Sequence, residues 1–230
     1  MLEFFTQSVF FGAFLSLLFY EVGVYCKKRW KKAFLNPLLI SVVLTIAFLC
    51  ICKIPYSVYQ GSAKYLSYLL TPATICLAIP LYEQIELLKK NAVAIFAGIV
   101  SGMLTSLVMV LVFAVLFHFT HEEYVTFLPK SITTAIGMGV SEQLGGYVAI
   151  TVAVIIMTGV IGNILAEPVC RIFKITDPVA KGIGIGSASH AIGTARAMEM
   201  GEIEGAMSGL SIAVSGVFTV FAAALFANFY

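Results

Sequence analysis

The sequence predicts an all-α, polytopic integral membrane protein with about seven or eight membrane segments, two of them broken or re-entrant. Three features of the composition predict this class: 60% of the residues are hydrophobic, only 11% are charged, and the mean hydropathy is +0.99. An average soluble domain has about 25% charged residues, and a soluble chain of 230 residues could not bury so much apolar surface. The composition therefore excludes a soluble enzyme and a disordered chain.

The first predicted span covers residues 4–26. Glu3 stands where a signal peptide has basic residues, and no small-residue cleavage site follows, so we expect this span to be retained. Residues 27–32 are basic, and short basic loops are held on the cytoplasmic side of the membrane. They predict a cytoplasmic loop and an N-terminus outside; a nucleic-acid patch is disfavoured because the run lies between two spans. The cations of this run are Lys27, Lys28, Arg29, Lys31 and Lys32.

The second span is predicted to begin at Asn36-Pro37 and to end near Cys52, since proline fits the first turn of a helix. Residues 53–64 are polar and predict a loop. The third segment, residues 65–88, is interrupted by Pro72 and Pro80.

Three further spans are predicted, at residues 92–117, 147–166 and 206–229. Two segments between these spans differ from them because they are rich in small and polar residues. Residues 128–146 are too polar and too rich in glycine for a helix that faces lipid, so we expect them to be re-entrant or packed inside protein. Residues 181–200 form a second segment of small residues.

An internal repeat is indicated by a layout that occurs twice: an interrupted segment, then a glutamate, then a full span. This layout divides a single transmembrane domain, residues 1–230, into inverted repeats at 36–117 and 128–229. Paired broken segments in corresponding halves indicate the midplane site of a transporter. The alternative is a coincidence, or kinks that only help helices to pack.

Arg196 is the first candidate for chemistry, because a charge in mid-membrane costs about 2.5–3.5 kcal/mol and needs a partner. A substrate anion would supply that partner; the alternative is a local pair with Glu199 at i+3. On a continuous helix, Ser189, Gly193 and Arg196 would share one face.

His190, Lys130 and Glu83 each have two interpretations. His190 could relay a proton or form an interhelical hydrogen bond. Lys130 precedes hydroxyl residues that, at the N-terminus of a broken helix, would bind an anion; alternatively it is an interfacial lysine. Glu83 is a proton acceptor or an interfacial residue. The substrate-binding candidates are Arg196, Lys130, Ser131, Thr133, Thr134, Ser187, Ser189 and Thr194, and the proton-coupling candidates are His190, Glu83 and Glu199.

Motifs for metal, cofactor or covalent chemistry are missing from the sequence. The five cysteines have no C-x-x-C spacing and lie mostly in apolar runs, which favours buried hydrophobic residues over disulfides or a metal site. There is no Walker A or nucleophile-elbow motif, and the glycines of GIGIGSAS follow a basic loop rather than a strand. We expect no enzymatic activity, no cofactor and no metal.

The string GIGIGSASHAIGTARAMEMGEIEGAMSGL, preceded by LPKSITTAIG, PLYEQ and LNPLL, resembles the LrgB/CidB family of bacterial membrane proteins from about Asn36 to the C-terminus. The resemblance implies modulation of murein hydrolase activity and autolysis, as antiholin-like or holin-like partners of the small LrgA/CidA membrane proteins. Relatives of the family include a plant plastid glycolate/glycerate translocator, and bacterial members are linked to pyruvate uptake. Ala135 stands where many relatives have proline, which weakens any inference about a helix break there.

Two functional hypotheses follow. The first is a proton-coupled transporter of small monocarboxylates of the glycolate, glycerate or pyruvate type, which works by alternating access. The alternative is an antiholin/holin-like regulator of murein hydrolase activity that acts with a small LrgA/CidA-type partner. Both place the chain in the cell membrane as a multi-pass protein in contact with the bilayer and not with nucleic acid. Helix faces rich in small residues also favour a homodimer.

Overall fold

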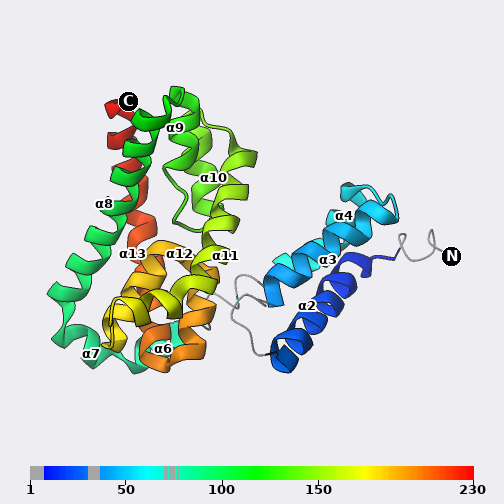
Figure 1. Ribbon diagram of the computed structural model, residues 1–230, viewed down its shortest axis with the longest axis horizontal. Coiled ribbons are helices and arrows are strands. Elements are labelled where there is room, and N and C mark those ends of the chain that lie inside the picture. Colours follow the sequence, from blue (N-terminus) through cyan, green and yellow to red (C-terminus); the bar gives the residue numbers. More distant parts are fainter. Residues whose placement is uncertain (1–7, 31–36, 70–71, 73–75, 77) are drawn as a thin grey trace. The chain divides into compact units, whose positions relative to one another are not determined.

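The computed structural model describes residues 8–30, 37–69, 72, 76 and 78–230, and these residues form helices and no strands (Figure 1). The chain divides into two compact units, Met1–Cys76 and Leu77–Tyr230, which we call unit 1 and unit 2. For the described residues, the predicted all-α class is confirmed.

In unit 1, a long helix packs against two shorter ones through its glycines. A Cβ atom added to Gly12 would lie 2.5 Å from the carbonyl oxygen of Tyr59, and one added to Gly23 would lie 2.6 Å from that of Pro37. The Gly12 amide, in the first turn of its helix, donates to Ser62 Oγ at 2.8 Å, so a free N–H of that turn has a partner. The three helices are α2 (Phe11–Trp30), α3 (Pro37–Ile51) and α4 (Tyr56–Ser67).

The basic run after the first apolar segment was expected to be a loop, and this is wrong for its first part. Lys27, Lys28 and Arg29 form the last turn of α2. Cations are stabilised there by the partial negative charge of the helix C-terminus. Lys31 and Lys32 lie outside the described residues, and the cytoplasmic side of the run stays a prediction.

The polar loop expected at residues 53–64 is also wrong for most of its length, because α4 begins at Tyr56 directly after Pro55. Its polar residues are helical because they pack on α2, where Tyr59 Oη lies 2.7 Å from Ser16 Oγ. The interrupted segment predicted at residues 65–88 lies partly outside the described residues.

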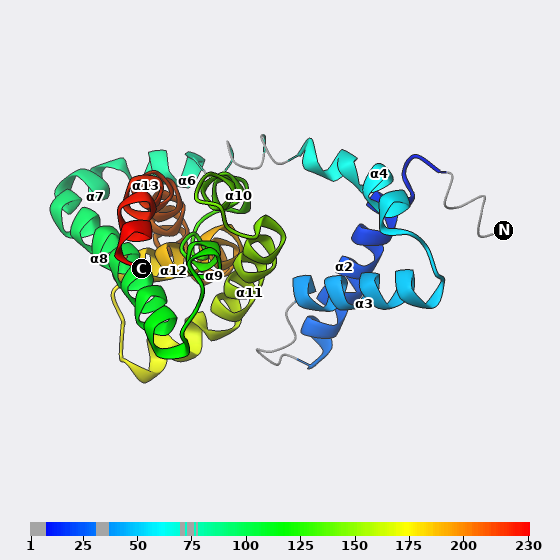
Figure 2. The same cartoon turned by 90° about the horizontal axis from the view of Figure 1, so that it is seen from above.

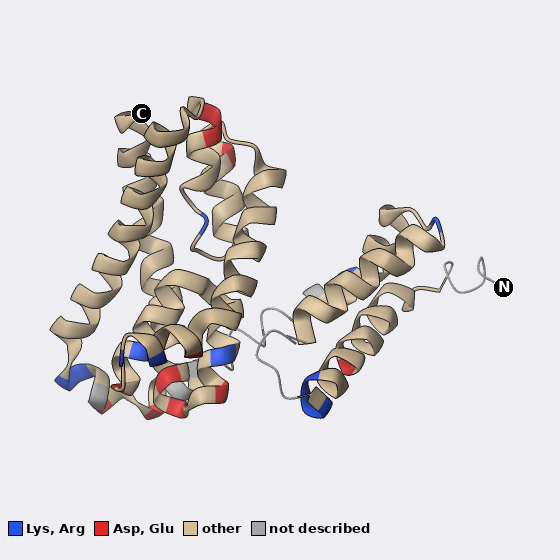
Figure 3. Ribbon diagram, in the orientation of Figure 1, with Lys and Arg blue, Asp and Glu red and all other residues tan. Residues whose placement is uncertain are grey.

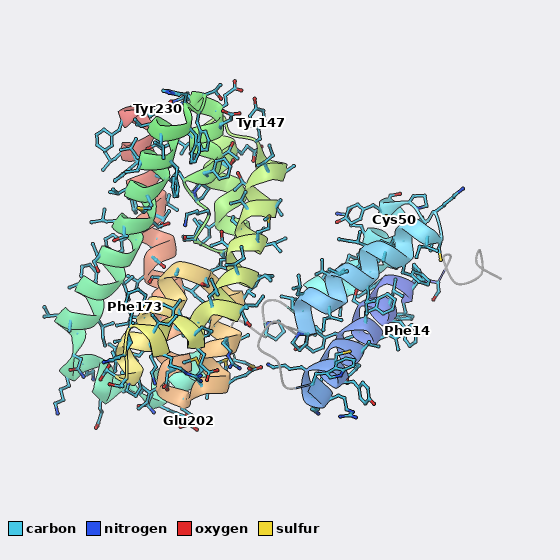
Figure 4. The ribbon with its side chains drawn as sticks, viewed as in Figure 1. Phe14, Cys50, Tyr147, Phe173, Glu202 and Tyr230 are labelled. Atoms are coloured by element: carbon cyan, nitrogen blue, oxygen red, sulfur yellow. The ribbon has the colours of Figure 1, made fainter. Side chains whose placement is uncertain are left out.

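Unit 2 is built around three long helices, α8, α11 and α13, and α12 packs against all three (Figure 2). Tyr147 and Tyr230 lie at one end of these helices, the tyrosine end, and Glu202 lies at the other, the charged end (Figure 4). Lysines, arginines and carboxylates gather at the charged end (Figure 3). The elements are α6 (Ala78–Glu83), α7 (Ile85–Lys90), α8 (Ala92–Phe117), α9 (His121–Phe127), α10 (Thr134–Gln143), α11 (Val148–Ile172), α12 (Pro178–Met200), α13 (Glu202–Phe226) and the 3-10 helix η1 (Ala227–Phe229).

Three of the described helices are long and apolar enough to cross a membrane: α8, α11 and the stretch Glu202–Phe229. The helix α8 has the bounds predicted for the span at residues 92–117. The helix α11 continues six residues beyond the predicted end at 166, to Ile172. The total of seven or eight segments and the division into repeats stay predictions.

Helices α9 and α10 form a hairpin that begins and ends at the tyrosine end. A capping box starts α9: the Thr120 amide donates to Glu123 Oε2 at 2.8 Å, and the Glu123 amide donates to Thr120 Oγ1 at 3.2 Å. At the far side of the hairpin, the Tyr147 hydroxyl donates to Glu122 Oε2 at 2.5 Å. Within the protein, residues 128–146 therefore turn back toward the side from which they came.

Helix α12 is a second hairpin, bent at His190, whose backbone has φ 42° and ψ −144°. Before the bend the chain runs parallel to α13: Gly182 lies against Glu204. After the bend it runs antiparallel: Thr194 Oγ1 lies 2.7 Å from Ser208 Oγ, and Met198 lies against Gly205. Both ends of α12 therefore reach the charged end. The prediction that Ser189, Gly193 and Arg196 share one face of a continuous helix is wrong, because the helix is interrupted at His190.

Side chains provide hydrogen-bond partners around the bend. His190 Nε2 donates to the carbonyl oxygen of Ile155 at 2.9 Å. Asn163 Nδ2 donates to the carbonyl oxygen of Ile192 at 2.7 Å, and Thr194 Oγ1 donates to that of His190 at 3.0 Å. In an apolar interior such partners are required wherever the helical hydrogen bonds stop.

The largest buried apolar cluster lies toward the tyrosine end, where α8, the α9–α10 hairpin and α13 meet. Tyr124 is fully buried there, and its hydroxyl donates to the carbonyl oxygen of Phe226 at 2.8 Å. The cluster connects the hairpin to both long helices. Its buried members are Met103, Leu107, Val110, Ala114, Tyr124, Val125, Leu128, Ile132, Val140 and Ala223.

The close contact between α12 and α13 can be tested with two glycines two positions apart. A Cβ atom at Gly182 would lie 2.5 Å from the carbonyl oxygen of Glu204, whereas one at Gly184 would meet nothing within 4 Å. We expect Gly182→Ala to destabilise the protein by about 1–3 kcal/mol and to lower the thermal unfolding midpoint in detergent. Gly184→Ala is the control and should keep or raise the midpoint, since alanine favours helix. Equal midpoints for the two variants would contradict this packing.

Candidate functional site

Arg196 joins two helices through a pair of ion pairs. Its guanidinium lies 2.5 Å from Glu199 Oε2 on α12 and 2.5 Å from Glu167 Oε2 on α11. The side chain is 23% exposed. The ion pair with Glu199 is the local i, i+3 pair considered in the sequence analysis as the alternative to a substrate anion. Glu167 adds a second partner from another helix. A substrate role for Arg196 stays a prediction.

Arg196 lines an open cleft of about 540 Å³ at the charged end. The cleft lies where the end of α11, both ends of α12 and the start of α13 meet. A second ion pair crosses it, because Lys181 Nζ lies 3.8 Å from Glu204 Oε1. Lys130 and His190 do not line this cleft. Its charged lining residues are Glu167, Arg171, Lys174, Lys181, Arg196, Glu199 and Glu204.

Lys130 lies at the tip of the α9–α10 hairpin and is half-buried. Its ammonium donates to Ser131 Oγ at 3.0 Å, and Ser131 Oγ lies 2.9 Å from Ser106 Oγ of α8. None of the described carboxylates forms an ion pair with Lys130. The sequence analysis expected both cations within the membrane, but the structure places them differently. Arg196 lies at the charged end, where carboxylates neutralise it, whereas Lys130 contacts a hydroxyl at the tip of the hairpin.

The tips of the two hairpins meet at a small void of about 10 Å³. Ser131 from the first hairpin and Ser187 from the second both line it, so the structure brings these two predicted residues together. The void is near the lower limit for holding a single water molecule. Its polar lining residues are Ser106, Ser131, Ser187, Ser215 and Thr219.

The remaining predicted residues are scattered. Thr133 and Thr134 begin α10 and are half-buried, and Thr133 makes no side-chain capping bond. Ser189 and Thr194 are buried on either side of the bend. Glu83 is exposed at the end of α6. Their roles in substrate binding and proton coupling stay predictions.

Two groups of polar residues were missed by the sequence analysis. Glu167 was missed because its partner lies 29 residues away and on another helix. The second group is a row of buried hydroxyls on α13, whose spacing of three and four residues could have revealed a polar face. The row consists of Ser208, Ser211, Ser215 and Thr219.

At the tyrosine end, a hydrogen bond from Tyr147 to Glu122 connects the start of α11 to α9. The hydrogen bond to the Glu122 carboxylate, together with its negative charge, raises the pKa of Tyr147 above its ordinary value. The hydrogen bond requires the neutral phenol as donor, so the raised pKa extends the pH range over which the bond is made. Among the described residues, no three His, Cys, Asp or Glu side chains are grouped closely enough to hold a metal ion.

Comparison with known proteins gives consistent matches. The profile of the LrgB-like family matches residues 16–229. The chain is 38% identical over 225 residues to the antiholin-like protein LrgB of Bacillus mycoides (strain KBAB4), with 97% of this chain and 98% of the relative covered. The proteins of the same name from Bacillus cereus (strain B4264) and Bacillus anthracis (strain CDC 684 / NRRL 3495) are 37% identical with the same coverage. No solved structure matches the chain.

The ion pairs of Arg196 predict a measurable contribution to stability. Arg196→Gln would leave Glu167 and Glu199 without their half-buried partner, so we expect a loss of about 1–2 kcal/mol, between the ranges for exposed and buried pairs. Thermal unfolding in detergent would measure it. Arg171→Gln is the matched control, because Arg171 also pairs with Glu167, at 3.1 Å, but its side chain is 80% exposed. A loss as large for Arg171→Gln would contradict the assignment.

Proposed function

Because the chain belongs to the LrgB-like family, we propose that it is an antiholin-like membrane protein that restrains murein hydrolase activity and autolysis. It acts with a small membrane partner of the LrgA/CidA type and without catalysis of its own. The name carried by its relatives supports this function, and the coverage of nearly the full chain supports extending it to the whole protein. The three long apolar helices found among the described residues support a location in the membrane.

The structural observation that carries the proposal is the way polar groups in unit 2 partner one another. Arg196 is held by two carboxylates, and the polar atoms at the α12 bend bind backbone carbonyls. In the described part of the chain, no buried side-chain nitrogen or oxygen lacks a hydrogen-bond partner. A protein whose task is assembly in the membrane needs its polar groups satisfied internally, whereas a transporter needs some of them facing its substrate.

Disruption of the gene in its host should raise murein hydrolase activity and speed detergent-induced lysis several-fold, because the restraint is removed. Zymography of cell extracts and the decline of culture turbidity measure these two effects. Re-expression of the chain should restore both, and co-purification should recover the small partner. Unchanged lysis and zymograms after disruption, with the partner still present, would contradict the proposal.

A second function, transport of small monocarboxylates coupled to protons, is favoured by Lys130. Its ammonium donates to the hydroxyl of Ser131 at the tip of one hairpin, and Ser131 lines the same void as Ser187 of the other hairpin. Hairpins that enter from opposite ends and meet at mid-height are an arrangement that alternating-access transporters use. A carboxylate of the glycolate, glycerate or pyruvate type would supply the anion that Lys130 lacks among the described carboxylates.

Uptake by liposomes separates the two functions. If the chain is a transporter, it should take up labelled pyruvate, glycolate or glycerate faster under an inward proton gradient. Lys130→Met should then reduce uptake at least tenfold, while Lys90→Met, at the exposed end of α7, should not. If the chain acts only as an antiholin-like regulator, Lys130→Met should still restore normal lysis, and liposomes should show no uptake.

A further inference from the structure

The cleft at the charged end continues into a second, apolar cavity. This cavity has a volume of about 200 Å³ and lies between α11 and the first half of α12. It shares Cys170, Ile175 and Lys181 with the cleft. The two cavities therefore form one feature with a charged part and an apolar part, which we call the cleft and the groove.

The groove is open because small residues line it on the α12 side. Gly184 and Ala188 are both exposed, and a Cβ atom added to Gly184 would meet nothing within 4 Å. On the α11 side, Leu165 and Val169 are large and partly exposed. The result is an apolar slot between two helices that faces outward, where the hydrocarbon of a bilayer would lie.

The cations of the cleft differ in how closely they pair with carboxylates. Arg196 is held by both Glu167 and Glu199, so these two carboxylates are largely compensated. Lys181 has a looser contact, at 3.8 Å, with Glu204. None of the described carboxylates forms an ion pair with Lys174.

Lys174 is held at the mouth of the cleft by the end of α11. Its backbone is left-handed, with φ 54°, and its amide donates to the carbonyl oxygen of Arg171 at 3.2 Å. The next amide, that of Ile175, donates to the carbonyl oxygen of Cys170 at 2.8 Å. These bonds close the helix end and keep Lys174 beside the point where the cleft and the groove join.

We propose that the cleft and the groove together bind one anionic phospholipid. The phosphate of its headgroup contacts Lys174 and Lys181, and one acyl chain lies along the groove. A soluble anion would use the cations but not the adjoining apolar slot, and a helix of a partner would fill the slot but not need the cations. Basic pockets between membrane helices are typical sites for anionic lipid headgroups. This lipid site does not depend on the function proposed above.

The test uses the purified full chain in detergent, with dioleoyl phosphatidylglycerol as the probe and dioleoyl phosphatidylcholine as the neutral comparison. Native mass spectrometry should show one phosphatidylglycerol retained per chain, and the thermal unfolding midpoint should rise more with this lipid than with phosphatidylcholine. Lys174→Gln should weaken phosphatidylglycerol binding about fivefold, as expected for the about 1 kcal/mol that one lysine contributes near anionic lipid. Gly184→Leu should weaken it independently by filling the groove.

Matched controls separate the site from general effects. Lys90→Gln removes a cation that does not line the cleft, and Gly139→Leu adds the same side chain at another exposed helical glycine with open space around it. Both should bind phosphatidylglycerol as the unaltered chain does. Equal binding of the two lipids would overturn the proposal, as would full competition by soluble glycerol phosphate. A Gly184→Leu variant that binds lipid normally but changes the mass of the complex in light scattering would also overturn it, in favour of a second copy in the groove.

Discussion

The bend at His190 is the feature on which the arrangement of unit 2 depends. A left-handed backbone at a residue other than glycine is strained, and it persists only where the surroundings hold it. Here the imidazole binds the carbonyl oxygen of Ile155, and Asn163 binds that of Ile192 beyond the bend. The imidazole bond ties the bend to α11, and the bonds of Asn163 and Thr194 give partners to carbonyls of α12 beside the bend. Helix α12 can therefore double back within an apolar interior and bring both its ends to the same end of the unit.

The folding back of α12 explains where the scarce charges lie. Lys181 near one end of the helix and Arg196 near the other reach carboxylates of α13 and α11, so three helices are joined by ion pairs around a single cleft. Lys130 belongs to the other hairpin and donates to the hydroxyl of Ser131 instead. The internal pairing of Arg196 favours a protein that assembles in the membrane, whereas the position of Lys130 is what keeps carboxylate transport as a second function.

Local sequence features predicted the parts of the fold that depend on hydropathy. The span at residues 92–117 agrees with α8, because a long apolar run can be satisfied in a bilayer only as a helix. The same reasoning failed for residues 56–67, which are polar enough to suggest a loop and are helical because they pack on α2 at Gly12. Hydropathy also did not locate the bend at His190, because the many small residues around it do not indicate where α12 is interrupted.

The sequence by itself determined the class of the protein, the family, the apolar helices and the segments in which unusual residues stand. Composition and hydropathy are properties of residues and of short windows, so they can be read without knowing which helices meet. Only the tertiary structure decided that Glu167 is the partner of Arg196, 29 residues away, and that Ser131 and Ser187 face one void. The first pairing depends on the direction in which α12 leaves its bend, and both depend on contacts between segments that are distant in the sequence.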